Sequence, residues 1–109
     1  MHIQIINFHL RGVSETDYRA HCDEVAPAFA EVPGLVSKVW LANSTTNTYG
    51  GVYTWASREA METFAKSELF KAVATNPNLA GITSIDFHVL EDPTSVTREP
   101  ASTPPTPAG

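Results

Sequence analysis

Apolar residues along the first third of the chain follow a strand period and then a helix period. Residues 3 to 10 are β-branched and apolar with polar residues interspersed, which is typical of a strand. Ser14, followed by Asp17 three positions later, resembles a capping box and predicts a helix that ends near Val32. Helical spacing predicts the buried stripe of this helix: Tyr18, Cys22, Val25, Phe29 and Val32.

The middle of the chain predicts a pair of strands. Pro33-Gly34 ends the first helix, and residues 35 to 42 are predicted to form a second strand. Residues 43 to 48 form a polar turn that leads into a third strand from Tyr49 to Ala56. Because the connection is short, we expect these two strands to form an antiparallel hairpin.

A second helical region and a last strand complete the pattern. Ser57 is predicted to cap a helix from Arg58 to about Lys66, a short helical piece follows at residues 69 to 73, and residues 82 to 91 predict the last strand. The order β-α-β-β-α-β is the ferredoxin-like arrangement, an α+β fold. Its four-stranded antiparallel sheet carries helices on one face.

Composition divides the chain into one domain and a tail. We assign residues 1–92 to a single domain, because a chain of 109 residues has no room for a second one. Residues 93–109 are rich in Pro, Thr and Ser and have no apolar periodicity. Such a segment buries too little surface to offset its ordering entropy, so we expect disorder or an extended arm on a partner subunit.

The net charge of the chain and the distribution of its apolar residues limit the partners that we expect it to bind. The net charge is −5 and the seven basic residues are scattered, which argues against a nucleic-acid partner. The second and fourth strands are apolar on both faces, so a homodimer is expected to cover the face without helices. No run approaches the roughly 18 apolar residues that span a bilayer, and the chain begins with a strand pattern, so we expect a cytoplasmic protein that does not enter a membrane.

Cysteine and histidine spacing predicts neither a metal site nor a disulfide. Cys22 is the only cysteine in the chain, and in the apolar stripe it is interpreted as an inert buried thiol. No Rossmann fingerprint is present either. The sequence therefore predicts no cofactor and no metal.

Aromatic residues on one face of the third strand suggest a binding site. Tyr49, Tyr53 and Trp55 alternate onto the same face, and Gly51 leaves a gap among them. This is the outline of a flat pocket for a small aromatic or hydrophobic metabolite, although each side chain could instead be core. Trp40, Met61 and Phe64 are further members of the expected substrate-binding set, although the position of Trp40 favours core or dimer interface over the pocket.

Histidines carry the acid–base chemistry that the sequence offers, because imidazole titrates near neutrality. His88 is the predicted general base, with a structural histidine bonded to Asp86 as the alternative. Asn7 and His9 are expected to meet His88 across the first strand if all three face the helices, and Asn7 and Tyr53 would be hydrogen-bond donors. His21 could line the same cavity.

Four motifs in this order resemble the YdhR-like "putative mono-oxygenase" family of the dimeric α/β-barrel superfamily, over about residues 1 to 97. They are Val32-Pro33-Gly34-Leu35, Lys38-Val39-Trp40, Gly50-Gly51-Val52-Tyr53 and Asp86-Phe87-His88-Val89. The resemblance implies a homodimer with its sheets packed face to face and a ligand cavity between sheet and helices in each subunit. It also implies an activity like that of the cofactor-free antibiotic-biosynthesis monooxygenases, which oxidise polycyclic phenols with molecular oxygen.

The segment from Trp55 to Ala60 is similar to the strand-to-helix junction of those monooxygenases, in which a Trp sits in the substrate pocket. They also carry an Asn four residues before this Trp and a Tyr six residues after it. Gly51 and Met61 occupy those positions here, so the oxygenase chemistry does not carry over intact.

Three functions are consistent with these observations. The first is a cofactor-independent monooxygenase of a small aromatic or polyketide-like phenol, with Trp55 as the stacking wall. The second is a polyketide cyclase or isomerase that uses the same histidine base without oxygen. The third is a non-catalytic small-molecule-binding protein, which the missing Asn and Tyr favour.

Overall fold

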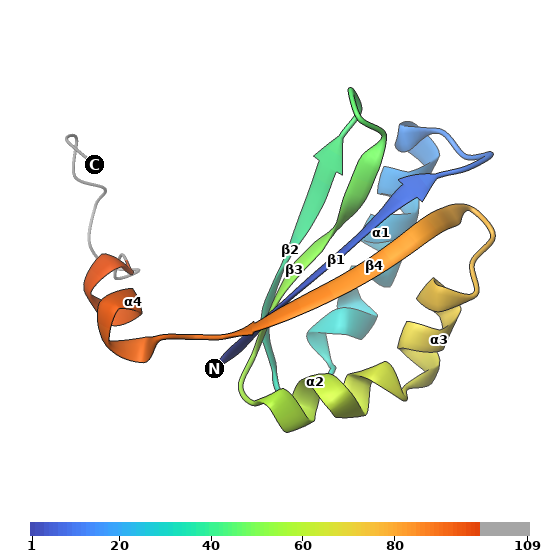
Figure 1. Ribbon diagram of the computed structural model, residues 1–109. Helices are drawn as coiled ribbons and strands as arrows, with labels where there is room; N and C mark the ends of the chain where they lie inside the picture. The colour runs from blue at the N-terminus through green and yellow to red at the C-terminus, as the bar shows by residue number, and fades with distance from the viewer. Residues whose placement is uncertain (99–109) are drawn as a thin grey trace.

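The computed structural model describes residues 1–98. Its strands and helices follow the predicted β-α-β-β-α-β order, with the second helical region divided in two and one further helix at the end (Figure 1). The elements are β1 His2–Leu10, α1 Glu15–Ala30, β2 Leu35–Asn43, β3 Thr48–Trp55, α2 Arg58–Ala65, α3 Glu68–Ala74, β4 Leu79–His88 and α4 Glu91–Thr97.

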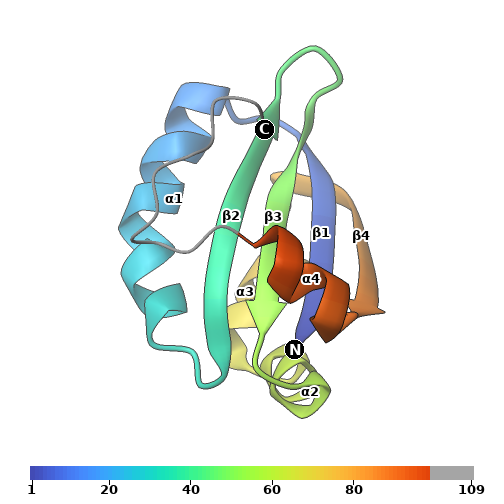
Figure 2. The same cartoon turned by 90° about the vertical axis from the view of Figure 1, so that its left-hand side faces the viewer.

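The four strands form one antiparallel sheet in the order β2-β3-β1-β4. Helices α1, α2 and α3 all lie on one side of this sheet, and α4 stands out on the other side, beyond the end of β4 (Figures 1 and 2). The predicted α+β ferredoxin-like fold is therefore confirmed.

Serine side chains begin three of the helices. Ser14 Oγ accepts a hydrogen bond from the backbone N–H of Asp17, and Ser57 Oγ accepts one from Ala60, each at 3.1 Å. These bonds satisfy amide groups that have no partner within the helix, and they fix both helix starts where the sequence predicted them. Ser67 caps α3 in the same way.

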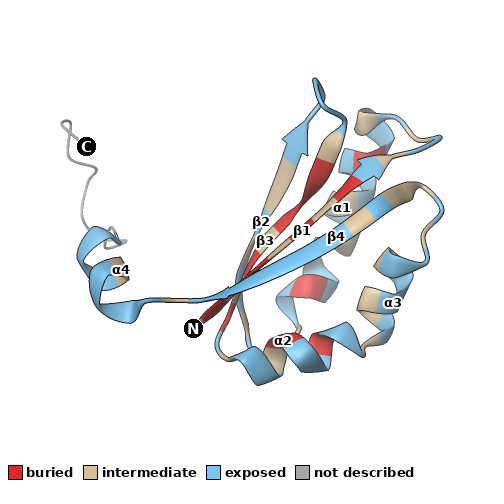
Figure 3. Ribbon diagram, in the orientation of Figure 1, coloured by how far each residue is buried: buried red, intermediate tan, exposed pale blue. Residues whose placement is uncertain are grey.

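The core lies between the sheet and its helices. Alternate residues of β1 are buried, and Ile6 and Phe8 point toward the helices. Trp55 from β3 and Phe64 from α2 pack with their ring centres 5.2 Å apart and are almost completely buried. Buried residues gather on the inner strands and on the inward faces of α1 and α2 (Figure 3).

The open face of the sheet leaves large apolar side chains in contact with solvent. Val39 is 57% exposed on β2, and Ile85 and Phe87 are 53% and 52% exposed on β4. Strand pairing places Ile5 opposite both Val52 and Ile85, so the apolar residues form a continuous band across the sheet.

The last strand and the segment after it differ from the prediction. β4 begins at Leu79 instead of Ile82, because Gly81 takes a left-handed backbone conformation that lets Leu79 pair with Leu10 past a bulge in β1. A helix that the sequence did not predict, α4, covers Glu91–Thr97. Pro93 lies in its first turn, where a missing N–H costs no helical hydrogen bond. The remainder of the predicted tail, residues 99–109, lies outside the described residues.

No helix within residues 1–98 is long and apolar enough to cross a membrane.

Candidate functional site

Three adjoining hollows lie between α1 and the sheet. An inner cavity of about 40 Å³ lies between α1, the helix side of the sheet and α3. A groove of about 470 Å³ lies outside it, between the first half of α1 and the end of β2. A third hollow of about 290 Å³ lies between the end of α1 and the start of β2. Trp40 lines all three hollows and separates the inner cavity from the two outer ones.

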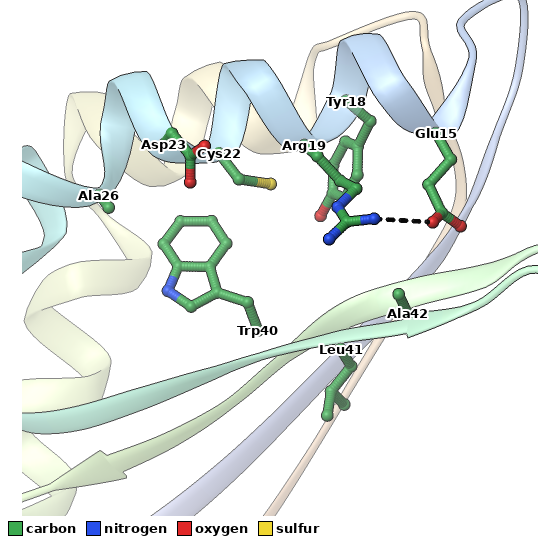
Figure 4. Close-up of a pocket in the computed structure, with 9 residues that line it drawn as sticks. All are labelled: Glu15, Tyr18, Arg19, Cys22, Asp23, Ala26, Trp40, Leu41 and Ala42. Carbon is green, nitrogen blue, oxygen red and sulfur yellow. Dashed lines mark ion pairs between the residues drawn. The ribbon is translucent and has the colours of Figure 1, made fainter.

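The larger groove, here called the α1–β2 groove, has a polar rim and an aromatic wall (Figure 4). Arg19 lies 3.7 Å from the Glu15 carboxylate at one end of the rim. The other Glu15 oxygen accepts a hydrogen bond of 2.5 Å from the Tyr49 hydroxyl, which raises the pKa of that phenol. Cys22 and the Trp40 indole approach each other where the groove meets the inner cavity (Figure 4). A groove of this volume matches small-molecule sites, whereas the inner cavity alone holds about one water.

Lys38 is the charged group of the inner cavity. Its Nζ lies 3.4 Å from the centre of the Trp40 ring, 3.5 Å from that of Phe29 and 4.7 Å from that of Tyr53. Within residues 1–98, no carboxylate lies within ion-pair distance of this amine. The ring faces attract an ammonium group. Burial removes the water that would solvate the charged amine, and this effect is larger than the opposing effect of the neighbouring Cys22. Burial thus lowers the pKa of Lys38 from its ordinary 10.5 to about 7.

Tyr18, Tyr53 and Cys22 are uncharged groups of the inner cavity. Burial raises the pKa of the Tyr18 and Tyr53 phenols well above the usual value, so both remain hydrogen-bond donors at neutral pH. Burial also raises the pKa of Cys22, although Lys38 and a hydrogen bond with Tyr18 lower it in part. Cys22 is consequently a thiol and not a thiolate.

Several sequence-predicted site residues do line the inner cavity. Tyr53 and Trp40 lie on its wall, and His21 from α1 lies at its edge, largely exposed. Gly51 has a role that the sequence did not reveal. A Cβ at that position would come within 2.8 Å of Lys38 Cε, so the gap predicted among the aromatics holds the lysine stem.

His88 and Asn7, predicted to be catalytic with Tyr53, and His9, predicted to bind substrate beside them, are not brought together. His88 is exposed at the end of β4, where it lines a separate hollow beside α4. Asn7 lies on the open side of the sheet, because it alternates with buried Ile6 and Phe8. His9 is exposed beyond the β1 bulge, and its Nδ1 lies 2.7 Å from the Asn47 carbonyl.

Asp86 also has a different partner from the one considered in the sequence. Its carboxylate lies 2.6 Å from Nε2 of His2, because His2 and Gln4 are neighbours of β4 on the helix side of the sheet. His88 is therefore not held by Asp86 in the described residues.

The remaining predicted wall residues are core. Trp55 is completely buried; its indole N–H donates to Gln4 Oε1 at 3.0 Å, and its ring stacks on Tyr53 at 5.9 Å. Trp55 packs against Tyr53, which lines the inner cavity, but Trp55 itself does not line it. Tyr49, Met61 and Phe64 are buried in the same cluster and are absent from the inner-cavity lining.

Lys38 was missed because a lysine in a strand is usually solvent-exposed. Two signals in the sequence pointed to it. It shares a face with Trp40, two positions on, and it faces Tyr53 across the hairpin. Among residues 1–98, no cluster of three or more His, Cys, Asp or Glu residues could hold a metal ion.

The lowered pKa of Lys38 predicts a pH-dependent stability. Between about pH 7 and pH 10 the unfolded chain keeps a proton on Lys38 that the folded chain has lost, so the free energy of unfolding rises with pH in this window. Lys38→Met removes the proton from both states and should flatten this rise. Urea unfolding of both proteins at about pH 6, 8 and 9.5 measures it. Equal pH dependence in the two proteins would contradict a desolvated lysine.

Comparisons with known proteins give a family and a fold. The sequence profile described as "Putative mono-oxygenase ydhR" matches residues 3–100. No curated protein matches the sequence. Among solved structures, the heme-degrader MhuD from Mycobacterium tuberculosis, with two hemes bound in its active site, is 22% identical, with a TM-score of 0.67 over 84% of this chain and 98% of that one.

Two further solved structures are similar. A "putative antibiotic biosynthesis monooxygenase" from Deinococcus radiodurans is 13% identical, with a TM-score of 0.67 over 82% of this chain and 92% of that one. SnoaB, a cofactor-independent oxygenase from Streptomyces nogalater, is 18% identical, with a TM-score of 0.63 over 83% of this chain and 94% of that one. At these identities the likeness concerns the fold.

Proposed function

Since this chain belongs to the ydhR mono-oxygenase family, we propose that it is a cofactor-independent monooxygenase of a small aromatic or polyketide-like phenol. The substrate occupies the α1–β2 groove and places its acidic hydroxyl in the inner cavity. Lys38 is the base, in place of the histidine that the sequence suggested. The observation that carries this proposal is a lysine amine held among three aromatic rings without a carboxylate partner in the described residues.

Such an amine suits the first chemical step. With a pKa near 7, Lys38 is partly neutral at neutral pH and can take a proton from a bound phenol or enol. The ammonium that forms then stabilises the phenolate, because charges attract strongly in a site with little water. An electron-rich phenolate can pass an electron to molecular oxygen, so the protein needs to supply a base, a dry cavity and positioned donors.

The cavity also supplies the groups that would orient the substrate. Tyr18 and Tyr53 keep their hydroxyl protons and can donate to the substrate oxygens. Phe29 and Trp40 present ring surface to a flat molecule. Because the inner cavity is small and Trp40 also lines the outer groove, movement of this indole would join the two spaces.

Oxygen consumption tests the proposed function against its alternatives. We expect the purified protein, colourless and without added metal or flavin, to consume oxygen with at least one member of a panel of polycyclic phenols. Substrate loss without oxygen uptake would instead indicate the cyclase or isomerase. Saturable binding without turnover would indicate a binding protein, and activity that tracks a retained flavin, haem or metal would contradict cofactor independence.

We further propose that the functional form is a homodimer that buries the open face of the sheet. The support is the exposed apolar band that contains Val39, Ile85 and Phe87. A monomer rarely leaves so many large apolar side chains together in water, and a second copy offers the same surface for a symmetric contact.

Light scattering tests the dimer. The unaltered chain is expected to have twice the monomer mass at micromolar concentration. Ile85→Asp places two buried charges in a symmetric interface and should give a monomer, whereas Thr63→Asp, which adds the same charge at an exposed position on α2, should remain dimeric. A monomeric unaltered protein would contradict the proposal.

A further inference from the structure

Lys38 combines three properties that proton transfer alone does not require. Lys38 lines the inner cavity and also the hollow at the start of β2, so its side chain borders two spaces that could hold a ligand. The rings of Phe29 and Trp40 lie against the amine at 3.5 and 3.4 Å and limit its hydration. No carboxylate among residues 1–98 is placed to hold it as an ammonium ion. These are the surroundings of a nucleophilic lysine.

We propose that Lys38 reversibly forms an imine with the carbonyl group of a flat aromatic aldehyde or ketone bound at this site. This inference uses the same amine as the proposed function, but imine formation needs no oxygen, so the two proposals can be tested separately. Aromatic walls select the aromatic part of the ligand, and the amine selects the carbonyl group. Exclusion of water also favours the imine, because water is a product of its formation.

The cavity holds the proton donors that the reaction needs. The lysine nitrogen adds to the carbonyl carbon and loses one proton, and the carbonyl oxygen gains one to give a carbinolamine. The carbon then loses the hydroxyl group and the nitrogen loses its second proton, which releases one water and leaves the C=N bond with no change in oxidation state. Tyr53 and Tyr18 line the cavity with protonated hydroxyls that can supply and recover these protons.

The titratable groups that face the amine set its pH dependence. Tyr18, His21 and Cys22 reach the inner cavity from α1, and Tyr53 reaches it from β3. Apart from an exposed imidazole, these groups are neutral near pH 7, and the effect of Cys22, which favours the charged lysine, is smaller than the effect of burial. An ordinary lysine is neutral in only about one molecule in 2,500 at this pH. Lys38 should therefore react ahead of the other lysines.

Reductive trapping of the full chain tests this inference. The protein is incubated without oxygen at about pH 7 with 2-naphthaldehyde and cyanoborohydride, which converts an imine into a stable amine, and the adducts are mapped by mass spectrometry. Lys66 and Lys71 are exposed and serve as internal controls. The adduct on Lys38 is expected to exceed those on Lys66 and Lys71 by at least about tenfold. The Met1 amine, which reacts in most proteins, is counted separately.

Two comparisons make the result decisive. In urea the three lysines should label equally, because the selectivity comes from the folded site. Lys38→Arg should remain folded, as circular dichroism would verify, and should leave Lys66 and Lys71 with their weak labelling unchanged. Equal or weaker labelling of Lys38 in the folded protein would overturn the inference. If Lys38 were not labelled selectively but the protein still consumed oxygen with phenols, the imine proposal would fail and the proposed monooxygenase would be unaffected. If Lys38 were labelled selectively but no phenol caused oxygen uptake, the imine proposal would hold and the proposed monooxygenase would fail.

Discussion

Lys38→Met is expected to lower the turnover of a phenol substrate by roughly 10²–10⁴-fold while the protein remains folded, because loss of a general base commonly has an effect of this size. Methionine keeps most of the apolar stem that packs beside Gly51 and among Phe29 and Trp40. The amine is lost while the shape of the cavity is kept. Oxygen uptake at saturating substrate measures the change in turnover, and circular dichroism establishes that the fold is intact.

Three other variants distinguish this role from its alternatives. Lys38→Arg keeps the positive charge but cannot act as a base near neutrality, so it should also lose turnover while retaining affinity for the substrate. Lys71→Met removes an exposed lysine and should match the unaltered protein. His88→Ala tests the base that the sequence favoured; because His88 is exposed beside α4, we expect little change. A large loss in His88→Ala together with an active Lys38→Met would reverse the assignment.

The fold could be predicted because its signals are local. Strand and helix periods differ, and serines precede α1 and α2 at the predicted positions. The errors occur where distant contacts decide the local structure. The early start of β4 depends on a bulge in β1 and on the conformation of Gly81, which no periodicity in residues 76 to 82 reveals. Pro93 was assigned by composition to a tail expected to be disordered or extended, although the first turn of a helix accepts proline.

The site was predicted only in part, because alternation along a strand shows which side chains lie on the same face of the sheet but not which of them reach the cavity. The aromatic face of β3 was correct, yet Trp55 lies completely in the core and Tyr53 lies in front of it. The first strand separates Asn7 and His88 because alternation sends Asn7 to the open side. The role of Lys38 could be recognised only once the position of α1 was known, because Phe29 from that helix completes the aromatic surroundings that desolvate the amine.

Trp55→Ala is expected to reduce the free energy of unfolding by about 3–5 kcal/mol, which is a large part of the roughly 5–15 kcal/mol typical of a domain of this size. Trp55 is completely buried, packs against Tyr53 and Phe64, and donates its indole N–H to Gln4 Oε1. Alanine would leave a cavity behind the site and an amide oxygen without its donor. Urea unfolding followed by circular dichroism measures the loss.

Two further variants interpret the loss of stability in Trp55→Ala. One separates the contribution of packing from that of the hydrogen bond, and the other compares a core residue with a residue that lines the site. Trp55→Phe keeps an aromatic ring but removes the donor, so it should cost only about 1–3 kcal/mol, the usual penalty for an unsatisfied buried acceptor. Trp40→Ala alters a half-buried ring that lines all three hollows, and should weaken ligand binding with less loss of stability than Trp55→Ala. If Trp55→Ala instead kept its stability and lost only affinity, Trp55 would contact the ligand directly, as the sequence first suggested.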